Sequence, residues 1–329
     1  MSKKSNKGLK RFVVFLAILV IAFPAVAFGY VYFKLTSIHD STADNSILNN
    51  LSFKNEKGIN NILLIGTDGR PGESSSRSDA MMILTVDSKN KSLKLTSLAR
   101  DTYVDTPGKG NIKLTEAYAY GGVNLLTQTL ENNFNLDIHN YAAVDFYSFM
   151  DIVDALGGVT VEVKENEIRE LNKFIPETYA WNENSDKGPM QTITSSGEQT
   201  LNGYQTLAFS RIRKNDSAME RDRRQRLVIQ GLVNGVKELP LTRYPKLVDT
   251  ILPYVKTNMK PGEIISLGGK VLGIGDLSIK QMEFPIDDGV HSNGHKINGK
   301  WVLEFDPGSI DILHDFIFKN IMPEDNDKL

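Results

Sequence analysis

The chain has 329 residues, 40% of them hydrophobic and 24% charged, which excludes wholly disordered, collagen-like and coiled-coil proteins. The 38 Lys and Arg residues nearly balance the 40 Asp and Glu residues, so we expect no nucleic-acid partner. The sequence contains no cysteine, which excludes disulfides, cysteine-ligated metals and a thiol nucleophile.

The N-terminus predicts a membrane anchor. Five Lys and Arg residues and no acid lie within 1–11, and the next 22 residues carry no charge. A run of about 20 apolar residues spans a bilayer as a helix, and preceding cations favour a cytoplasmic N-terminus. A small-x-small signal-peptidase pattern occurs at 25–27, but apolar residues continue past it, so we favour a retained anchor. We therefore expect a single-pass type II protein of the cell membrane, divided into a cytoplasmic tail (1–11), a transmembrane anchor (12–33), an extracellular stalk (34–57), an outer domain (58–322) and a C-terminal tail (323–329).

Periodicity in the outer domain predicts strands interleaved with helices. The expected strands cover 61–65, 80–86, 93–98, 141–144, 159–163 and 277–284, and the expected helices cover 114–133, 147–156, 199–209, 217–238, 245–256, 261–272 and 309–319. Glycine pairs break the first helix at 121–122 and end the second at 157–158. The polar stretch 165–197 predicts an irregular surface insertion. This pattern indicates a layered α/β domain without regular doubly wound alternation.

Two aspartates border the first two strands. Asp68 directly follows the first strand, and Asp79 opens the second. If these strands are neighbours, both carboxylates can converge at one edge of the sheet, where they would suit a hard cation such as Mg²⁺. Taken alone, however, Asp68 is better explained as a turn residue and Asp79 as a strand cap.

Three further clusters of charged residues lie farther along the chain. Arg100 and Asp101 end the third strand, and Lys113 stands at the start of a helix. Arg211 and Arg213 are two apart on an extended segment, so their side chains would point the same way. Each group alone could also be an ordinary exposed end of an element.

The helix predicted over 217–238 changes character along its inward face. An apolar stripe with helical spacing covers its second half. Helical geometry sorts the polar residues before it into three groups: Gln225 and Asp222 on the inward face, Arg221 and Arg226 on its flanks, and Arg223 and Arg224 pointing outward. An inward face lined by Arg and Gln suggests a cavity that holds an anion, although a solvated, salt-bridged face is the usual explanation for such a helix.

Arginines beside a two-carboxylate metal site suit a diphosphate substrate. Arginine forks hydrogen-bond phosphate in pairs, and Mg²⁺ neutralises charge on phosphoryl oxygens. Other motifs lack support. Residues 294–300 have the spacing of a P-loop, but Trp301 stands where Ser or Thr must bind the metal. His291 and His295 lie in a Gly-rich loop and are poor metal ligands, and no Gly-x-Ser-x-Gly elbow occurs.

At these clusters the sequence closely resembles the LytR-CpsA-Psr family of Gram-positive cell-envelope proteins. The matching motifs are Gly66-Thr67-Asp68-Gly69-Arg70, Arg77-Ser78-Asp79, Ser97-Leu98-Ala99-Arg100-Asp101, Ala117-Tyr118-Ala119-Tyr120-Gly121-Gly122, Asp154-Ala155-Leu156-Gly157-Gly158-Val159 and Arg211-Ile212-Arg213-Lys214-Asn215-Asp216 through Arg224-Gln225. The sequence departs from the family pattern at Ala99, where proline is usual, and at Glu116, where many members have His or Ala.

The resemblance implies an α/β/α domain around a central mixed sheet, with an apolar pocket for a polyprenyl chain. It implies that Asp68 and Asp79 hold Mg²⁺ or Mn²⁺. It also implies a diphosphate shell of Arg70, Arg77, Arg100, Lys113, Arg211, Arg213, Arg221 and Gln225. Asp79, Arg100 and Asp101 are the expected catalytic residues, with Asp79 and Asp101 as alternatives for the general base.

The activity implied by the resemblance is a phosphotransferase outside the cell. It would move a glycosyl-phosphate polymer, most commonly wall teichoic acid, from an undecaprenyl diphosphate carrier to N-acetylmuramic acid of peptidoglycan. Two alternatives stay open at this point: a polyprenyl-phosphate-binding regulatory module without catalysis, and a polyprenyl pyrophosphatase that uses water as the acceptor.

Overall fold

The computed structural model describes residues 30, 32–36, 53–69, 77–185, 187–212, 218–240, 243, 249–286 and 288–326. Among these residues, no helix combines the length and the apolar character needed to cross a membrane. The cytoplasmic tail and most of the anchor predicted over 12–33 lie outside the described residues, so they stay predictions, as do the domain boundaries.

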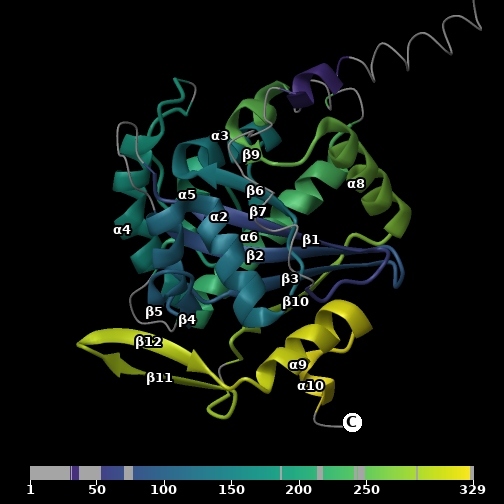
Figure 1. The fold of residues 1–329 in the computed structure, drawn as a ribbon. Helices are drawn as coiled ribbons and strands as arrows, with labels where there is room; N and C mark the ends of the chain where they lie inside the picture. Colours follow the sequence, from purple (N-terminus) through teal and green to yellow (C-terminus); the bar gives the residue numbers. More distant parts are fainter. Residues whose placement is uncertain are drawn as a thin grey trace, which may run out of the picture.

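A six-stranded mixed sheet forms the centre of the domain (Figure 1). In spatial order its strands are β10 (Ile279–Phe284), β3 (Ser92–Leu98), β2 (Ser78–Asp87), β1 (Ile59–Thr67), β6 (Asn140–Asp145) and β9 (Lys256–Thr257). The pairs β1–β6 and β10–β3 are parallel, and the other three pairs are antiparallel. Because Thr67 pairs with both Ser78 and Asp145, the C-terminal end of β1, the N-terminal end of β2 and the C-terminal end of β6 lie side by side at the same end of the strands.

The helices divide between the sheet and a second core beside it. They are α2 (Leu114–Phe134), α3 (Phe146–Leu156), α4 (Glu165–Trp181), α5 (Gly203–Ser210), α6 (Ala218–Glu238), α8 (Pro261–Ile274), α9 (Ser309–His314) and α10 (Pro323–Asn326), with a 3₁₀ turn at Leu252–Tyr254 and a π-helical turn at Asp315–Lys319. Three two-stranded antiparallel sheets complete the described chain: β4 (Tyr103–Thr106) with β5 (Gly110–Lys113), β7 (Val159–Val163) with β8 (Gly197–Leu201), and β11 (Ser292–Ile297) with β12 (Lys300–Phe305).

Strand alternation sends apolar side chains to both faces of the sheet, and helices cover both. Leu63 and Ile65 of β1 pack with α2 and the C-terminal helices. Ile62 of the same strand packs on the opposite face with α6 and α8, through residues such as Ile229 and Leu267. A strand buried on both faces needs helices on both sides, which explains the three layers. The predicted mixed α/β fold is therefore confirmed.

A second core lies between α3, α4, α5, α6 and the β7–β8 sheet. Gly203 at the start of α5 allows close packing there, because a Cβ atom at this position would lie 2.4 Å from the carbonyl oxygen of Met150 in α3. This core carries α6 alongside the sheet, so that α6 contacts both cores through Val228 and Ile229. The first turns of α6 therefore lie where the two cores meet.

Most predicted elements are present, and the glycine predictions are confirmed. Gly122 interrupts α2 with a φ of 61°, and Gly157 ends α3 in the left-handed region. One prediction was wrong: the stretch 165–197 is not an irregular insertion, because it contains α4. The helix predicted over 199–209 is present as α5, but it begins at Gly203 because β8 extends to Leu201. The helix predicted over 245–256 is in part outside the described residues.

Candidate functional site

The two predicted metal-binding aspartates lie on adjacent strand ends. β1 and β2 are antiparallel neighbours with a register shift at Gly66/Thr67, directly before Asp68. The backbone N–H of Asp68 donates to the Arg77 carbonyl (3.1 Å), and Asp68 Oδ1 accepts the Arg77 backbone N–H (2.6 Å). These paired contacts hold Asp68 at the same end of the strands as Asp79, which lies at the start of β2. The strand pairing required by the sequence argument is therefore present.

A chain of ion pairs leads away from Asp79. Arg100 Nη1 donates to Asp79 Oδ1, and Arg100 Nε lies 3.8 Å from Asp101 Oδ2. Asp101 Oδ1 in turn pairs with Lys113 Nζ at 2.8 Å. The four side chains are only 19–23% exposed, so their charges are partly shielded from water. The structure thus places Lys113 and Asp101 in the same cluster as Asp79 and Arg100.

A cavity of about 260 Å³ opens between α3, α5, α6 and the neighbouring ends of β1, β2 and β6. Four predicted site residues line it: Asp79, Arg211, Arg221 and Gln225. The rest of its lining is largely apolar and includes Met82, Val144, Phe146, Phe149, Ile152, Leu207, Val228, Ile229 and Leu232. Along α6 the lining changes from Arg221 and Gln225 to Leu232 over a rise of about 16 Å. The cavity therefore has a charged end and an apolar end.

Aromatic rings surround the guanidinium of Arg211. It lies 4.5 Å from the ring centroid of Trp181, 5.2 Å from that of Phe174 and 5.6 Å from that of Phe146. Its Nη1 also pairs with Glu177 Oε2 at 3.0 Å. Cation–π contacts fix the plane of a guanidinium while leaving N–H groups available for an anion. Arg211 is therefore held in place beside the charged end of the cavity.

Arg221 lies in a buried charge network at the start of α6. Its Nη2 is 3.4 Å from Asp222 Oδ1, and its buried Nε has no hydrogen-bond partner within the described part of the chain. Burial raises the pKa of Asp222, which also bonds to Glu283, against the opposing effect of the charges of Arg221 and Arg226. Arg221 also lines the cavity, and a buried donor without a partner is costly unless a ligand accepts from it. This arrangement favours an anion next to Arg221.

The prediction that Arg224 points outward was wrong. Arg224 is fully buried, donating from Nη1 to Glu167 Oε1 (3.0 Å) and from Nη2 to the Ile212 carbonyl (2.9 Å). Arg223 is only partly exposed and also pairs with Glu167, at 2.7 Å. The periodicity argument missed this because it considered the sheet side of α6 alone. Helix α4 covers the opposite side and brings Glu167 to both arginines.

A model of the LytR_cpsA_psr family matches residues 25–315. The chain belongs to the LytR-CpsA-Psr family. The polyisoprenyl-teichoic acid–peptidoglycan teichoic acid transferase TagT of Bacillus subtilis (strain 168) is 33% identical over 277 residues, which cover 80% of this chain and 82% of TagT. TagU of Bacillus anthracis, with the same descriptive name, is 37% identical over 210 residues. That match covers 63% of this chain and 62% of TagU, which is less than two thirds of its length. A solved structure of TagT bound to LI-WTA superimposes with a TM-score of 0.65 at 25% identity, covering 86% of this chain and 98% of that one.

Some site residues inferred from the family resemblance are not placed by the structure. Arg70 and Arg213 lie outside the described residues. Arg77 is described and exposed, and it contacts Asp68 through its backbone. Its membership of a LytR-CpsA-Psr diphosphate shell stays a prediction.

Sequence reasoning missed the residues that support the predicted arginines. Glu177 and Trp181 lie in α4, which the polar composition of 165–197 concealed. Glu283 lies in the predicted strand β10, but no local signal relates it to Asp222. The spacing of Ile168, Leu171 and Ile175, at i, i+3 and i+7, was the one signal that could have revealed α4 in this LytR-CpsA-Psr protein.

Proposed function

We propose that this protein is a glycopolymer phosphotransferase of the cell envelope. It takes a glycosyl-phosphate polymer, most simply wall teichoic acid, from an undecaprenyl diphosphate carrier and attaches it to N-acetylmuramic acid of peptidoglycan. The family membership and the transferase names of its relatives support this proposal. The mixed sheet shared with TagT bound to LI-WTA supports it as well.

One observation carries the proposal. A single cavity joins Asp79, Arg211, Arg221 and Gln225 to a largely apolar wall. A polyprenyl diphosphate has the same division, with an anionic head and an apolar chain. Arginine forks match phosphate oxygens in pairs, and the apolar wall excludes water from the prenyl chain. Neither a nucleotide nor a free sugar has an apolar part that would use the far end of this cavity.

The residues also fit a divalent metal ion. Asp68 and Asp79 offer carboxylate oxygens at one partly exposed sheet edge, which is the donor type that Mg²⁺ and Mn²⁺ prefer. We propose that these two side chains hold the ion, which when bound would neutralise charge on the phosphoryl oxygens. Asp79 would then divide its oxygens between the ion and Arg100.

The proposed reaction exchanges the phosphoanhydride bond of the carrier diphosphate for a phosphodiester bond to the acceptor sugar. The acceptor hydroxyl oxygen forms a bond to the sugar-linked phosphorus, the bond between that phosphorus and the bridging oxygen breaks, and polyprenyl phosphate leaves with the bridging oxygen. Arg100, Arg211 and Arg221 stabilise the charge that moves to the leaving phosphate. The hydroxyl proton passes to a carboxylate, and Asp79 and Asp101 are the two available in the ion-pair chain. No nucleotide is required, because the diphosphate bond supplies the driving force.

We further propose that the catalytic domain lies outside the cell, anchored by residues 12–33 in the membrane that holds the lipid carrier. The sequence of the first 33 residues supports this location.

The experiment is a transfer assay with the full-length chain in detergent micelles. It contains lipid-linked teichoic acid precursor, Mg²⁺ and peptidoglycan oligomers, and covalent glycan adducts are measured by mass. We expect adducts with the wild type and at least a 10²-fold loss in both Asp79→Ala and Arg100→Ala. Arg169→Ala, whose side chain is 75% exposed on α4, is the matched control and should retain activity.

The products distinguish the alternatives. Bound lipid without any covalent product would favour the regulatory module, and released polymer phosphate without a glycan adduct would identify a pyrophosphatase. Full activity in both site variants would refute the assignment of the site. Circular dichroism of each variant separates a lost reaction from a lost fold.

A further inference from the structure

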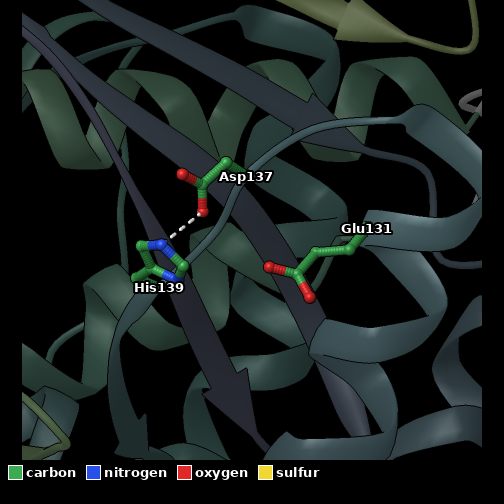
Figure 2. Close-up of side chains that lie close together, drawn as sticks. All are labelled: Glu131, Asp137 and His139. Carbon is green, nitrogen blue, oxygen red and sulfur yellow. Dashed lines mark ion pairs between the residues drawn. The ribbon is translucent and has the colours of Figure 1, made fainter. Parts of the chain in front are cut away.

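Three side chains that could bind a metal meet on the side of the domain away from the cavity. Glu131 lies near the end of α2, and Asp137 and His139 lie in the short connection from α2 to β6 (Figure 2). The chain reverses at Asn135, which caps α2 in the left-handed conformation. A β-bridge between Lys54 and Leu136 then holds the connection against the segment that precedes β1. The reversal brings Asp137 and His139 back over the last turn of the helix.

An ion pair and two hydrogen bonds orient the three groups. Asp137 Oδ1 lies 3.0 Å from His139 Nε2, and Asp137 Oδ2 accepts from Asn55 Nδ2 at 3.1 Å. Glu131 Oε1 accepts the backbone N–H of Ile138 at 3.0 Å. One ligand atom from each of Glu131, Asp137 and His139 lies within 4.8 Å of the other two. Figure 2 shows the Glu131 carboxylate turned toward the other two side chains.

The second oxygen of Glu131 is the observation that points to a ligand. Glu131 is 1% exposed, and its Oε2 has no hydrogen-bond partner among the residues that the structure describes. An isolated carboxylate oxygen buried without a partner is costly, and a cation next to it removes that cost. The His139 side chain is 59% exposed, which leaves a path for an ion from solvent.

We propose that Glu131, Asp137 and His139 bind one divalent transition-metal ion, with Zn²⁺ as the best match. One imidazole nitrogen and two carboxylate oxygens suit zinc, whereas Mg²⁺ prefers oxygen donors alone. Zinc bonds of about 2.0–2.1 Å place tetrahedral ligand atoms about 3.3 Å apart. The Asp137–His139 pair already has nearly this spacing, so Glu131 moves inward to complete three ligands, with water as the fourth.

This site is independent of the proposed transferase function. β6 runs from Asn140, next to His139, to Asp145, which lines the cavity. Six residues of strand separate His139 from Asp145 by about 20 Å, so one ion cannot serve both places. The bound ion would join the end of α2 to the start of β6 and thereby stabilise one side of the central sheet.

Zinc binding to the full-length chain without a polyhistidine tag, purified in detergent micelles, tests the proposal. Isothermal titration with Zn²⁺ should show a binding event in the wild type that His139→Ala and Glu131→Gln both lose or weaken by at least tenfold. An excess of Zn²⁺ about 100 times the dissociation constant should raise the unfolding midpoint of the wild type by about 5 °C, and that of neither variant. Mg²⁺ at the same concentration should not compete.

Two control variants make the result specific. His295→Ala removes a partly exposed histidine that lies 3.6 Å from Glu304, with no third metal-binding side chain beside them among the described residues, and it should bind Zn²⁺ as the wild type does. Asp79→Ala should also retain the zinc-binding event, since Asp79 belongs to the proposed Mg²⁺ site, at the other end of β6 from His139. Unchanged zinc affinity in His139→Ala would overturn the proposal, as would equal losses in His139→Ala and His295→Ala. Because His139 is exposed, its replacement should leave the fold intact.

Discussion

Two arginines one turn apart on α6 have opposite surroundings. Arg224 is buried against α4, where it donates to the Glu167 carboxylate and to the Ile212 carbonyl. Arg221 is almost equally buried, but it lines the cavity, and within the described part of the chain its carboxylate partner is Asp222 at 3.4 Å. The first arginine is engaged with the protein on two sides, whereas the second presents donors to an open space.

The difference teaches which side chains to assign to structure and which to ligand binding. Burial does not separate them, since both arginines are removed from solvent. What separates them is what lies beside the side chain: Arg224 donates to Glu167 and to the Ile212 carbonyl, whereas Arg221 lines the cavity. On this criterion Arg223, Arg224 and Glu167 form a closed network that holds α6 to α4. Arg211 and Arg221 form an open set that lines the cavity. Variants on either side can break or sharpen this division.

The largest effect is expected on the closed side. Arg224→Ala leaves Glu167, which is 2% exposed, with Arg223 as its remaining arginine partner. The change should cost about 4 kcal/mol of unfolding free energy, because Glu167 stays buried with one partner in place of two and the Ile212 carbonyl loses its donor. Urea denaturation of the full-length chain measures this. Arg223→Ala, which removes a partly exposed member, should cost about 1 kcal/mol. Equal stability of Arg224→Ala and wild type would contradict the closed network.

Glu131 is a buried carboxyl with no arginine partner among the described residues, whereas Glu167 has two. The comparison shows how arginine partners stabilise a buried carboxylate. Burial and the nearby Asp137 charge raise the pKa of Glu131 from 4.5 to about 7. Between these values the folded protein keeps a proton that the unfolded chain has lost, so stability falls as the pH rises through 7. The shift corresponds to about 3 kcal/mol.

Glu131→Gln tests this shift, since glutamine keeps an acceptor for the Ile138 N–H and cannot ionise. In a chelating buffer, the variant should gain about 3 kcal/mol relative to the wild type between pH 4.5 and pH 8. Urea denaturation at several pH values measures the difference. The nearby titrating groups, Asp137 and His139, remain in both proteins, so their contributions largely cancel. A difference that does not change with pH would contradict the raised pKa.

The same division explains what could be predicted from the sequence. A continuous apolar run located β1, period-two alternation located β7 and a stripe with helical spacing located α6, because each of these patterns lies within the residues of the element itself. The open set was also predictable, since Arg221 and Gln225 continue the inward stripe of α6 into polar residues. Such a polar end on an inward face is a local signal.

The closed network left no such signal. Arg224 is buried only because α4 packs against α6, and α4 was hidden because charged and polar residues are interspersed among its apolar ones, such as Ile168, Leu171 and Phe174. Glu177 reaches Arg211 from the same helix. Partners more than 30 positions apart depend on tertiary packing, so no pattern within either segment specifies them.

On the open side, Arg221→Lys should weaken binding without unfolding the protein. Lysine keeps a positive charge near Asp222 but lacks the planar fork that pairs with two phosphate oxygens. We expect about tenfold weaker binding of a polyprenyl diphosphate, measured by isothermal titration in micelles, and an unfolding free energy within about 1 kcal/mol of the wild type. Arg223→Lys, on the same helix but facing Glu167, should bind the lipid normally. Equal affinity losses in both variants would show that the cavity does not distinguish them.

The smallest effect concerns the one arginine of the open set that bonds to an exposed carboxylate. Glu177, 45% exposed, pairs with Arg211 at 3.0 Å and so competes with any anionic ligand for the same guanidinium. Glu177→Gln removes that competitor while Trp181 still holds Arg211 in place, so lipid diphosphate should bind about threefold more tightly. The gain should shrink at high salt, because screening weakens an exposed pair. Weaker binding by the variant would instead mean that Glu177 orients Arg211 for the ligand, which would move this arginine toward the closed set.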